Sequence, residues 1–106
     1  MRVGFVNGCF DLLHVGHIEM LEYAKSMCDH LVVAVDTDER VAQSKGPTRP
    51  FNNANDRQRM LIALKAVDET ACFATDEELI ATVQRYSPDI MVVGSDYKNR
   101  EVIGSE

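Results

Sequence analysis

The sequence has few cysteines and no long apolar run. No stretch approaches the length of a membrane span, and the start of the chain, MRVGFVNGCF, lacks the apolar core of a signal peptide. Cys9, Cys28 and Cys72 are odd in number and widely separated, which fits neither a disulfide framework nor a C-x-x-C metal site. We therefore expect a cytoplasmic protein with reduced thiols and no membrane partner.

Basic residues are in the minority. The 106 residues include 11 Lys and Arg against 17 Asp and Glu, for a net charge of -6. This balance argues against a broad electrostatic contact with nucleic acid, and an anionic ligand would need a local basic cluster. A hydrophobic share of 45% and a charged share of 26% are typical of globular proteins, and the length suits a single domain over residues 1–106.

Short apolar runs alternate with segments of helical periodicity. Four runs are strand-sized: RVGFV, LVVAV, ETACF and DIMVV. Apolar residues recur with helical spacing over 18–24 and 61–67, and Thr75 is predicted to cap a helix over DEELIATVQRY. Apolar strands joined by helices predict an α/β fold, a doubly wound parallel sheet with helices on both faces in three layers. Residues 36–56 contain two prolines and little periodicity, and are predicted to form a long ordered loop that ends where a helix begins near Asn55.

The polar motifs follow the predicted strands. NGCFDLLHVGH follows the first strand, the segment with Lys45 follows the second, and GSDY follows the fourth. Ligands of open parallel sheets bind outside the carboxyl ends of the strands. We therefore expect these three segments to converge on one edge of the sheet.

The first of these motifs has the features of a phosphate site. Gly8 allows a tight turn after the strand, and Gly16 allows another group to approach the main chain closely. Free amide groups at a helix start bind phosphate. His14 and His17 are three residues apart, so on one helical turn they share a face and can direct hydrogen bonds at one anion.

Other interpretations of this motif stay open. His14 could cap the helix while His17 is a solvated surface residue, and Asp11 could be a turn or capping residue. Zinc binding would need further ligands, and the third histidine, His30, starts the second strand without an obvious partner. We expect no metal site built by the protein.

Five segments together resemble a known family. GCFDLLHVGH, LVVAVDTDE, KGPTRP, Arg57 ahead of ALKAVDE, and PDIMVVGSDY occur in the order found in the nucleotidyltransferase superfamily with the H-x-G-H signature, in its cytidylyltransferase-like branch. Within the branch, VNGCFD, KGPTRPFN and GSDYKNREVIGSE are most similar to adenylyltransferases acting on glycero-manno-heptose 1-phosphate, followed by glycerol-3-phosphate cytidylyltransferases. The resemblance implies a Rossmann-like fold and leaves the base, adenine or cytosine, open.

The resemblance also implies roles for individual residues. His14, His17 and Lys45 would be catalytic, and Lys45 and Arg49 would hold the acceptor phosphate. The residues implied to bind the nucleotide are Gly8, Cys9, Phe10, Asp11, Gly16, Arg57, Gly94 and Asp96. Taken singly, each has an ordinary structural explanation: Lys45 as a solvated charge, Arg57 as a surface helix residue, and Gly94 with Asp96 as a turn. Arg59 also belongs to the basic group around residues 45–59.

The implied reaction transfers a nucleoside monophosphate, with ATP favoured as donor, to a sugar phosphate such as heptose 1-phosphate and releases pyrophosphate. An ionised acceptor phosphate needs no general base, and Mg²⁺ is expected to arrive with the triphosphate. Relatives continue to a final strand and a Ser/Thr-rich helix start that this chain is expected to lack, and many are homodimers. Transfer from CTP to glycerol 3-phosphate or another polyol phosphate, or nucleotide binding without turnover, are the alternatives. A dinucleotide site is disfavoured because the motif lacks G-x-G-x-x-G spacing.

Overall fold

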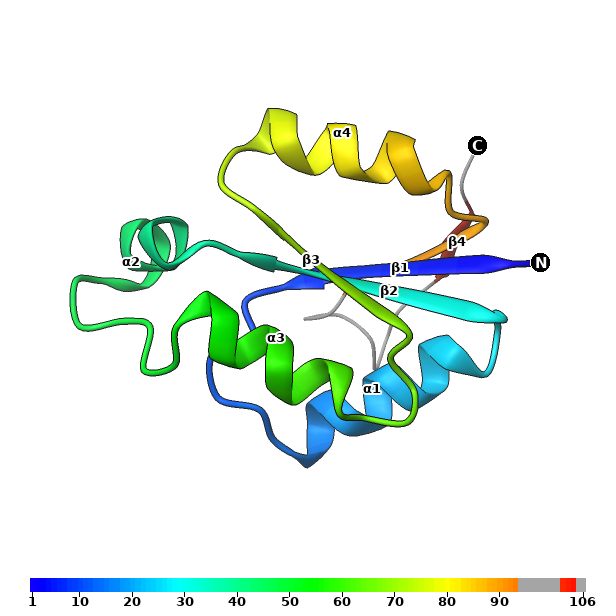
Figure 1. Cartoon of the computed structure of the whole chain (residues 1–106), viewed down its shortest axis with the longest axis horizontal. Helices are drawn as coiled ribbons and strands as arrows, with labels where there is room; N and C mark the ends of the chain where they lie inside the picture. The colour runs from blue at the N-terminus through cyan, green and yellow to red at the C-terminus, as the bar shows by residue number, and fades with distance from the viewer. Residues whose placement is uncertain (94–101, 105–106) are drawn as a thin grey trace.

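A single sheet lies between helices on its two faces (Figure 1). The computed structural model describes residues 1–93 and 102–104. The strands of this part of the chain are β1 (Val3–Gly8), β2 (His30–Asp36), β3 (Glu69–Phe73), β4 (Ile90–Val93) and β5 (Val102–Gly104). Its helices are α1 (Val15–Lys25), α2 (Asp38–Lys45), α3 (Ala54–Ile62) and α4 (Asp76–Tyr86). The strand order is β3-β2-β1-β4-β5, which confirms the predicted α/β architecture.

The first four strands are parallel, as predicted, and the fifth is not. Val6 of β1 pairs with Val33 of β2 on one side and with Val92 of β4 on the other. β5 runs antiparallel to β4 at the edge of the sheet, a strand that the apolar runs did not reveal. The chain moves outward from β1 to β3 and then returns to β4 on the other side of β1. The strand order therefore reverses between β1 and β4, which makes the carboxyl ends of these strands the expected ligand crevice.

Each face of the sheet has its own core. On one face, Leu21 of α1 and Leu61 of α3 belong to the same buried cluster as Val33 of β2. On the other face, α4 packs against buried Val32 and Phe73. Figure 1 shows α4 alone above the sheet, with α1 and α3 below it. Alternate residues of β2 point to opposite faces, and Leu31–Val35 are all apolar and buried because helices cover both sides.

Residues 38–45 form helix α2, so the prediction of a loop over 36–56 was wrong for this part. Thr37 caps the helix, its side chain accepting a hydrogen bond from the Arg40 amide at 3.3 Å, and Gly46 ends it with a φ of 110°. Val41 is the only buried residue of α2, so the helix shows no apolar stripe. Its signals were the Thr cap, two acidic residues in the first turn, and the Lys-Gly end.

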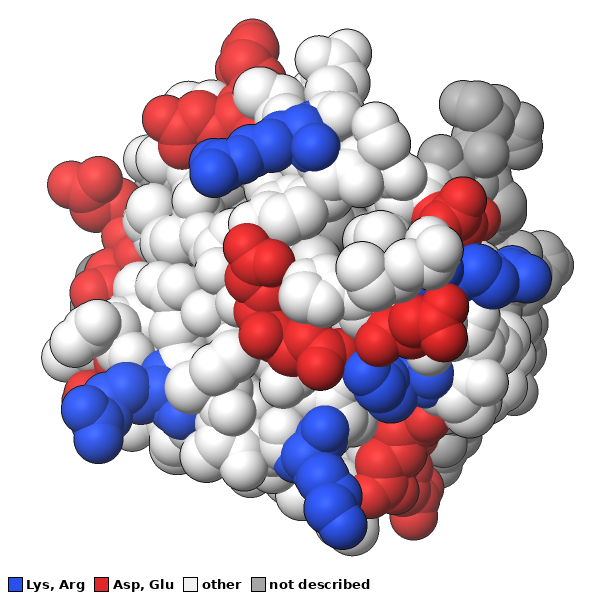
Figure 2. Space-filling view, turned by 45° about the vertical axis from the view of Figure 1, so that its right-hand side comes forward, with Lys and Arg blue, Asp and Glu red and all other residues white. Residues whose placement is uncertain are grey.

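Helices α3 and α4 begin near the predicted positions. Asn53 caps α3, which starts at Ala54 and ends at Ile62, so it is shorter than the periodicity over 61–67 indicated. Thr75 caps α4 through a hydrogen bond from the Glu78 amide, as predicted. No helix in the described part of the chain is long and apolar enough to cross a membrane. On the face shown in Figure 2, acidic side chains run through the middle, and Lys and Arg side chains are scattered around them.

Candidate active site at the β1–α1 turn

The turn between β1 and α1 is shaped by two glycines and one aromatic ring. Phe10 is buried and has a left-handed backbone with a φ of 51°. A Cβ atom on Gly8 would lie 2.9 Å from Cε2 of Phe10, so Gly8 leaves room for this ring. A Cβ on Gly16 would lie 2.9 Å from Cε1 of His14, which confirms that Gly16 allows a close approach. A side chain at either position would therefore displace the neighbouring ring.

The two histidines cap helix α1 reciprocally. Nδ1 of His14 accepts a hydrogen bond from the Gly16 amide at 3.1 Å, and Nδ1 of His17 accepts one from the His14 amide at 3.2 Å. A nitrogen that accepts a hydrogen bond carries no proton, so in each neutral ring the proton is on Nε2. The backbone thus leaves one N–H donor on each imidazole for a ligand.

The two imidazoles lie against each other. Their ring centroids are 3.9 Å apart with an interplanar angle of 22°, and the Phe10 ring meets His17 edge-on at 5.0 Å. Burial lowers the pKa of His17 below its usual 6.5, and the neighbouring His14 lowers it further. His17 is therefore a neutral hydrogen-bond donor at pH 7. The capping role and the shared face, which the sequence left as alternatives, occur together.

A cavity of about 260 Å³ opens at this turn. It is lined by Cys9, Phe10, Asp11, Leu12, His14, His17, Lys45 and Arg49. The structure therefore brings together both histidines, from the start of α1, and both predicted acceptor-phosphate residues, from the end of α2 and the segment after it. A larger cavity of about 570 Å³ lies beside Arg2, Cys28 and Asp89, near the amino ends of β1 and β4. The smaller one is the better candidate because ligands of parallel sheets bind at the carboxyl ends.

Lys45 and Arg49 differ in how firmly they are held. Lys45 is exposed in the last turn of α2, and its side chain makes no hydrogen bond or ion pair with any residue in the described ranges. Nε of Arg49 donates to Oδ2 of Asp11 at 2.6 Å, and its guanidinium carbon lies 4.7 Å from the centroid of the Phe51 ring. The side chain of Arg49 is 27% exposed. Both cations are accessible to an anion in the cavity.

The resemblance implied that Asp11 binds the nucleotide, but the structure shows its carboxylate buried and hydrogen-bonded to the protein itself. It is 3% exposed, and its carboxylate accepts hydrogen bonds from the amides of Phe51 and Asn52 as well as from Arg49. Its carbonyl accepts a further bond from Nδ2 of Asn52 at 2.7 Å. Burial alone would raise the pKa of Asp11, but these hydrogen bonds outweigh it, so the pKa is lowered and the group is ionised at neutral pH. Asp11 holds the 49–52 segment, which is closer to its alternative interpretation as a turn residue.

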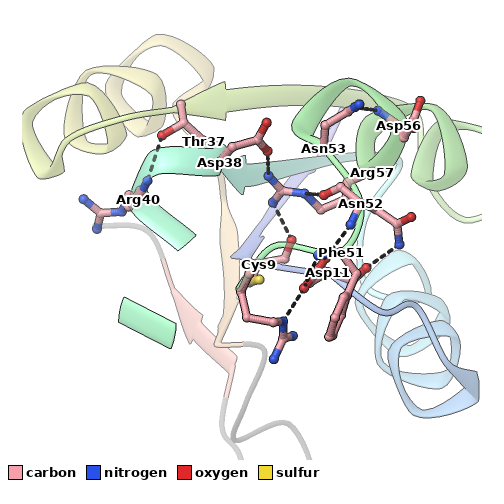
Figure 3. A network of polar contacts seen from close by, with 11 residues as sticks. Cys9, Asp11, Thr37, Asp38, Arg40, Phe51, Asn52, Asn53, Asp56 and Arg57 are labelled. Atoms are coloured by element: carbon pink, nitrogen blue, oxygen red, sulfur yellow. Dashed lines mark hydrogen bonds and ion pairs between the residues drawn. The ribbon is translucent and has the colours of Figure 1, made fainter. Parts of the chain in front are cut away.

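Arg57 also differs from its predicted role. Its guanidinium is fully buried and cannot reach a phosphate in the cavity. Figure 3 shows it surrounded by three partners: Nε donates to the carbonyl of Asn52 at 2.9 Å, Nη1 to the carbonyl of Cys9 at 2.9 Å, and Nη2 to Oδ1 of Asp38 at 2.7 Å. Arg57 joins α3 to the turn after β1 and to the start of α2. Phosphate binding by Arg57 was implied by the family resemblance, and the alternative was a surface helix residue; nothing in the local sequence signals that the side chain is buried.

Two structural residues of this network were not foreseen. Asn52 connects Asp11 to Arg57, and Asp38 is the charge partner of Arg57 with a side chain that is 48% exposed. The only indication of the role of Asn52 in the sequence was weak, namely that it follows a segment that contains prolines.

The remaining predicted residues lie elsewhere or are not described. Arg59 is exposed beside Gln58 and Thr70 in a separate shallow pocket, away from both histidines. Gly94 and Asp96 lie outside the described residues. Within the described part of the chain, no three His, Cys, Asp or Glu side chains lie together as metal ligands would.

Known proteins resemble this chain in sequence and in fold. The profile of the cytidylyltransferase-like family matches residues 5–102. The bifunctional proteins HldE of Hyphomonas neptunium and Caulobacter vibrioides are 44% and 43% identical over 106 residues, which are all of this chain and 22% of each relative. The chain thus spans about a fifth of these curated relatives. The lipopolysaccharide core biosynthesis protein from Thermoplasma volcanium has a similar structure, with a TM-score of 0.76 and 32% identity over 86% of this chain and 72% of that one.

Proposed function

This chain belongs to the cytidylyltransferase-like family, and on that premise we propose that it transfers a nucleoside monophosphate from a nucleoside triphosphate to a sugar phosphate. The observation that carries the proposal is the cavity lined jointly by His14, His17, Lys45 and Arg49. Two imidazole donors face the same space as two cations from a separate segment. Such a site suits a reaction between two anions, because both must be held together while negative charge moves to a leaving group.

The nucleotide phosphates would bind at the start of α1. The backbone at Gly8, Cys9 and Phe10 and the positive end of the helix dipole favour an anion there. The Nε2–H groups of His14 and His17 would donate hydrogen bonds to phosphate oxygens. Because His17 is neutral at pH 7, it would stabilise developing charge as a donor, without transferring a proton.

The acceptor would bind through its phosphate to Lys45 and Arg49. An oxygen of this ionised phosphate would form the new bond to the α-phosphorus while the bond from the α-phosphorus to the bridging oxygen breaks, and pyrophosphate would leave with that electron pair. No side chain need remove a proton from the acceptor. The role of the protein is to align the two phosphates and to neutralise their charge.

Magnesium would enter bound to the triphosphate. The described part of the chain offers imidazoles and cations at this site and no group of three acidic, His or Cys side chains, so phosphate oxygens and water would supply the ligands. When bound, the ion would neutralise charge on the phosphate oxygens.

We favour ATP as the donor and heptose 1-phosphate as the acceptor. The segments VNGCFD and KGPTRPFN resemble adenylyltransferases that use this acceptor, and the Thermoplasma relative is titled a lipopolysaccharide core biosynthesis protein. The family description favours a second candidate, transfer from CTP to glycerol 3-phosphate or another polyol phosphate.

The test measures pyrophosphate release with ATP and with CTP, each paired with heptose 1-phosphate and with glycerol 3-phosphate in the presence of Mg²⁺. We expect turnover with ATP and heptose 1-phosphate, and its loss in His17→Ala. His30→Ala is the matched control, because His30 starts β2 at the opposite end of the sheet. Turnover only with CTP would select the second candidate. Saturable nucleotide binding without pyrophosphate from any pair would make the chain a binding module and refute the proposal.

A further inference from the structure

Arg49 is held at two points while its outer edge stays accessible. Asp11 accepts the hydrogen bond from Nε, and the Phe51 ring lies against the guanidinium. An arginine side chain has five N–H donors, and the bond to Asp11 uses one of them. The terminal nitrogens therefore have a fixed direction and remain available to a phosphate, which arginine binds best through paired donors.

Asp11 is itself immobilised. The amides of Phe51 and Asn52 donate to its carboxylate at 2.8–3.0 Å, and Nδ2 of Asn52 donates to its carbonyl. Its side chain is only 1% exposed although it borders the cavity. A buried, ionised carboxylate would repel a phosphate at short range, so direct contact with either substrate is unfavourable. Asp11 can instead act on the site by fixing the orientation of the Arg49 side chain.

We propose that Asp11 is a positioning residue that directs Arg49 at the phosphate of the acceptor and touches neither substrate. This inference rests on the proposed function of the cavity, with the acceptor phosphate bound by Lys45 and Arg49. Under this proposal Asp11 affects binding of the acceptor and not of the nucleotide, because the nucleotide is held by the β1–α1 turn and the histidines. Loss of Asp11 therefore impairs the acceptor side selectively.

The kinetic test compares Asp11→Asn, Arg49→Lys and the double variant. Arg49→Lys keeps the positive charge but lacks the Nε–H that Asp11 binds. We expect Asp11→Asn to raise KM for the acceptor about tenfold and to change KM for the nucleotide by less than about twofold, as loss of one charge-assisted hydrogen bond predicts. In the Arg49→Lys background, Asp11→Asn should have no further effect. In a Lys45→Gln background its effect should persist in full, because Asp11 does not hold Lys45.

A second measurement is independent of turnover. Side-chain NMR of the full chain would follow the Nε–H signal of Arg49 during titration with inorganic phosphate. We expect a signal protected from exchange in the wild type, its loss in Asp11→Asn, and about a tenfold weaker affinity for phosphate. Circular dichroism of each variant would show whether the fold is retained.

The outcomes distinguish the two proposals. Absence of pyrophosphate from the wild type with every substrate pair would refute the proposed function, while the phosphate titration would still decide the role of Asp11. Equal rises in both KM values, additive effects in the Asp11 and Arg49 double variant, or unchanged phosphate affinity in a folded Asp11→Asn protein would overturn the positioning role.

Discussion

Arg57 offers the sharpest test of how this site is built. Arg57→Leu removes three hydrogen bonds and leaves the carbonyls of Cys9 and Asn52 without that donor. Because Asp38 is half exposed, water can hydrate the carboxylate left behind, and most of the loss comes from the two carbonyls, at about 1–3 kcal/mol each. Two carbonyls at this cost give about 2–6 kcal/mol, and we expect a loss near the middle of this range, about 3–5 kcal/mol.

A loss of this size is large for a domain stabilised by about 5–15 kcal/mol. At about 4–8 °C for each kcal/mol in a domain of this length, the Tm should fall by on the order of 12 °C or more. Urea and thermal unfolding followed by circular dichroism would measure both quantities. The matched control is Arg59→Leu, since Arg59 is exposed two residues further along α3. If Arg57→Leu were no less stable than this control and instead weakened nucleotide binding, Arg57 would be a phosphate ligand and the network described here would be wrong.

Two further predictions concern the cap and the far end of the sheet. Gly16→Ala should reduce pyrophosphate release by at least about tenfold, because the new Cβ displaces the His14 ring. The free energy of unfolding should change by less than about 1 kcal/mol, because alanine favours the helix. Unchanged turnover would show that the position of the His14 ring does not matter. Hydrogen bonds from Tyr86 and then His30 lower the pKa of Glu69 from 4.5, so this carboxylate stabilises the fold fully above pH 4.5 and loses that contribution as the pH falls through the lowered value. Urea midpoints of wild type and Glu69→Gln should therefore differ at neutral pH and converge in acid, and a constant difference would contradict this assignment.

The fold was predictable because its signals are local and repeated. Four apolar runs with helical segments between them require a parallel sheet covered on both faces, and the structure has that arrangement. Helix α2 was missed because it buries only Val41 and so has no apolar periodicity, although its cap and its Lys-Gly end were readable. The antiparallel β5 pairs with β4 at an edge, and its three residues contain no turn signal that fixes direction.

The position of the site was also predictable from the sequence, but which of its charged residues face the cavity and which are buried was not. The three-residue spacing of His14 and His17 puts both rings on one face of a helix. Lys45 and Arg49 follow the second strand, whose carboxyl end lies at the same edge of the sheet, and they line the same cavity as the histidines. Sequence cannot show that a charged side chain is buried, since charged residues are rarely buried unless paired and the partners lie far along the chain. Asp11 is 40 residues from Phe51, and Arg57 is 48 residues from Cys9.

The charged residues at the carboxyl ends of the strands fall into two groups: buried ions that hold the structure together, and accessible cations that can bind a ligand. A buried ion must be neutralised by the protein, which is what Asp38 does for Arg57 and what Arg49 and two amides do for Asp11. Asp38 pairs with Arg57, and Asp11 accepts only the Nε–H of Arg49, so the terminal nitrogens of Arg49 are left to a ligand. Lys45 and the outer edge of Arg49 remain as positive charge in a chain whose net charge is -6. The pairing with buried Asp11 fixes the direction of the terminal nitrogens of Arg49, so a substitution that breaks it should weaken anion binding even though no cation is removed.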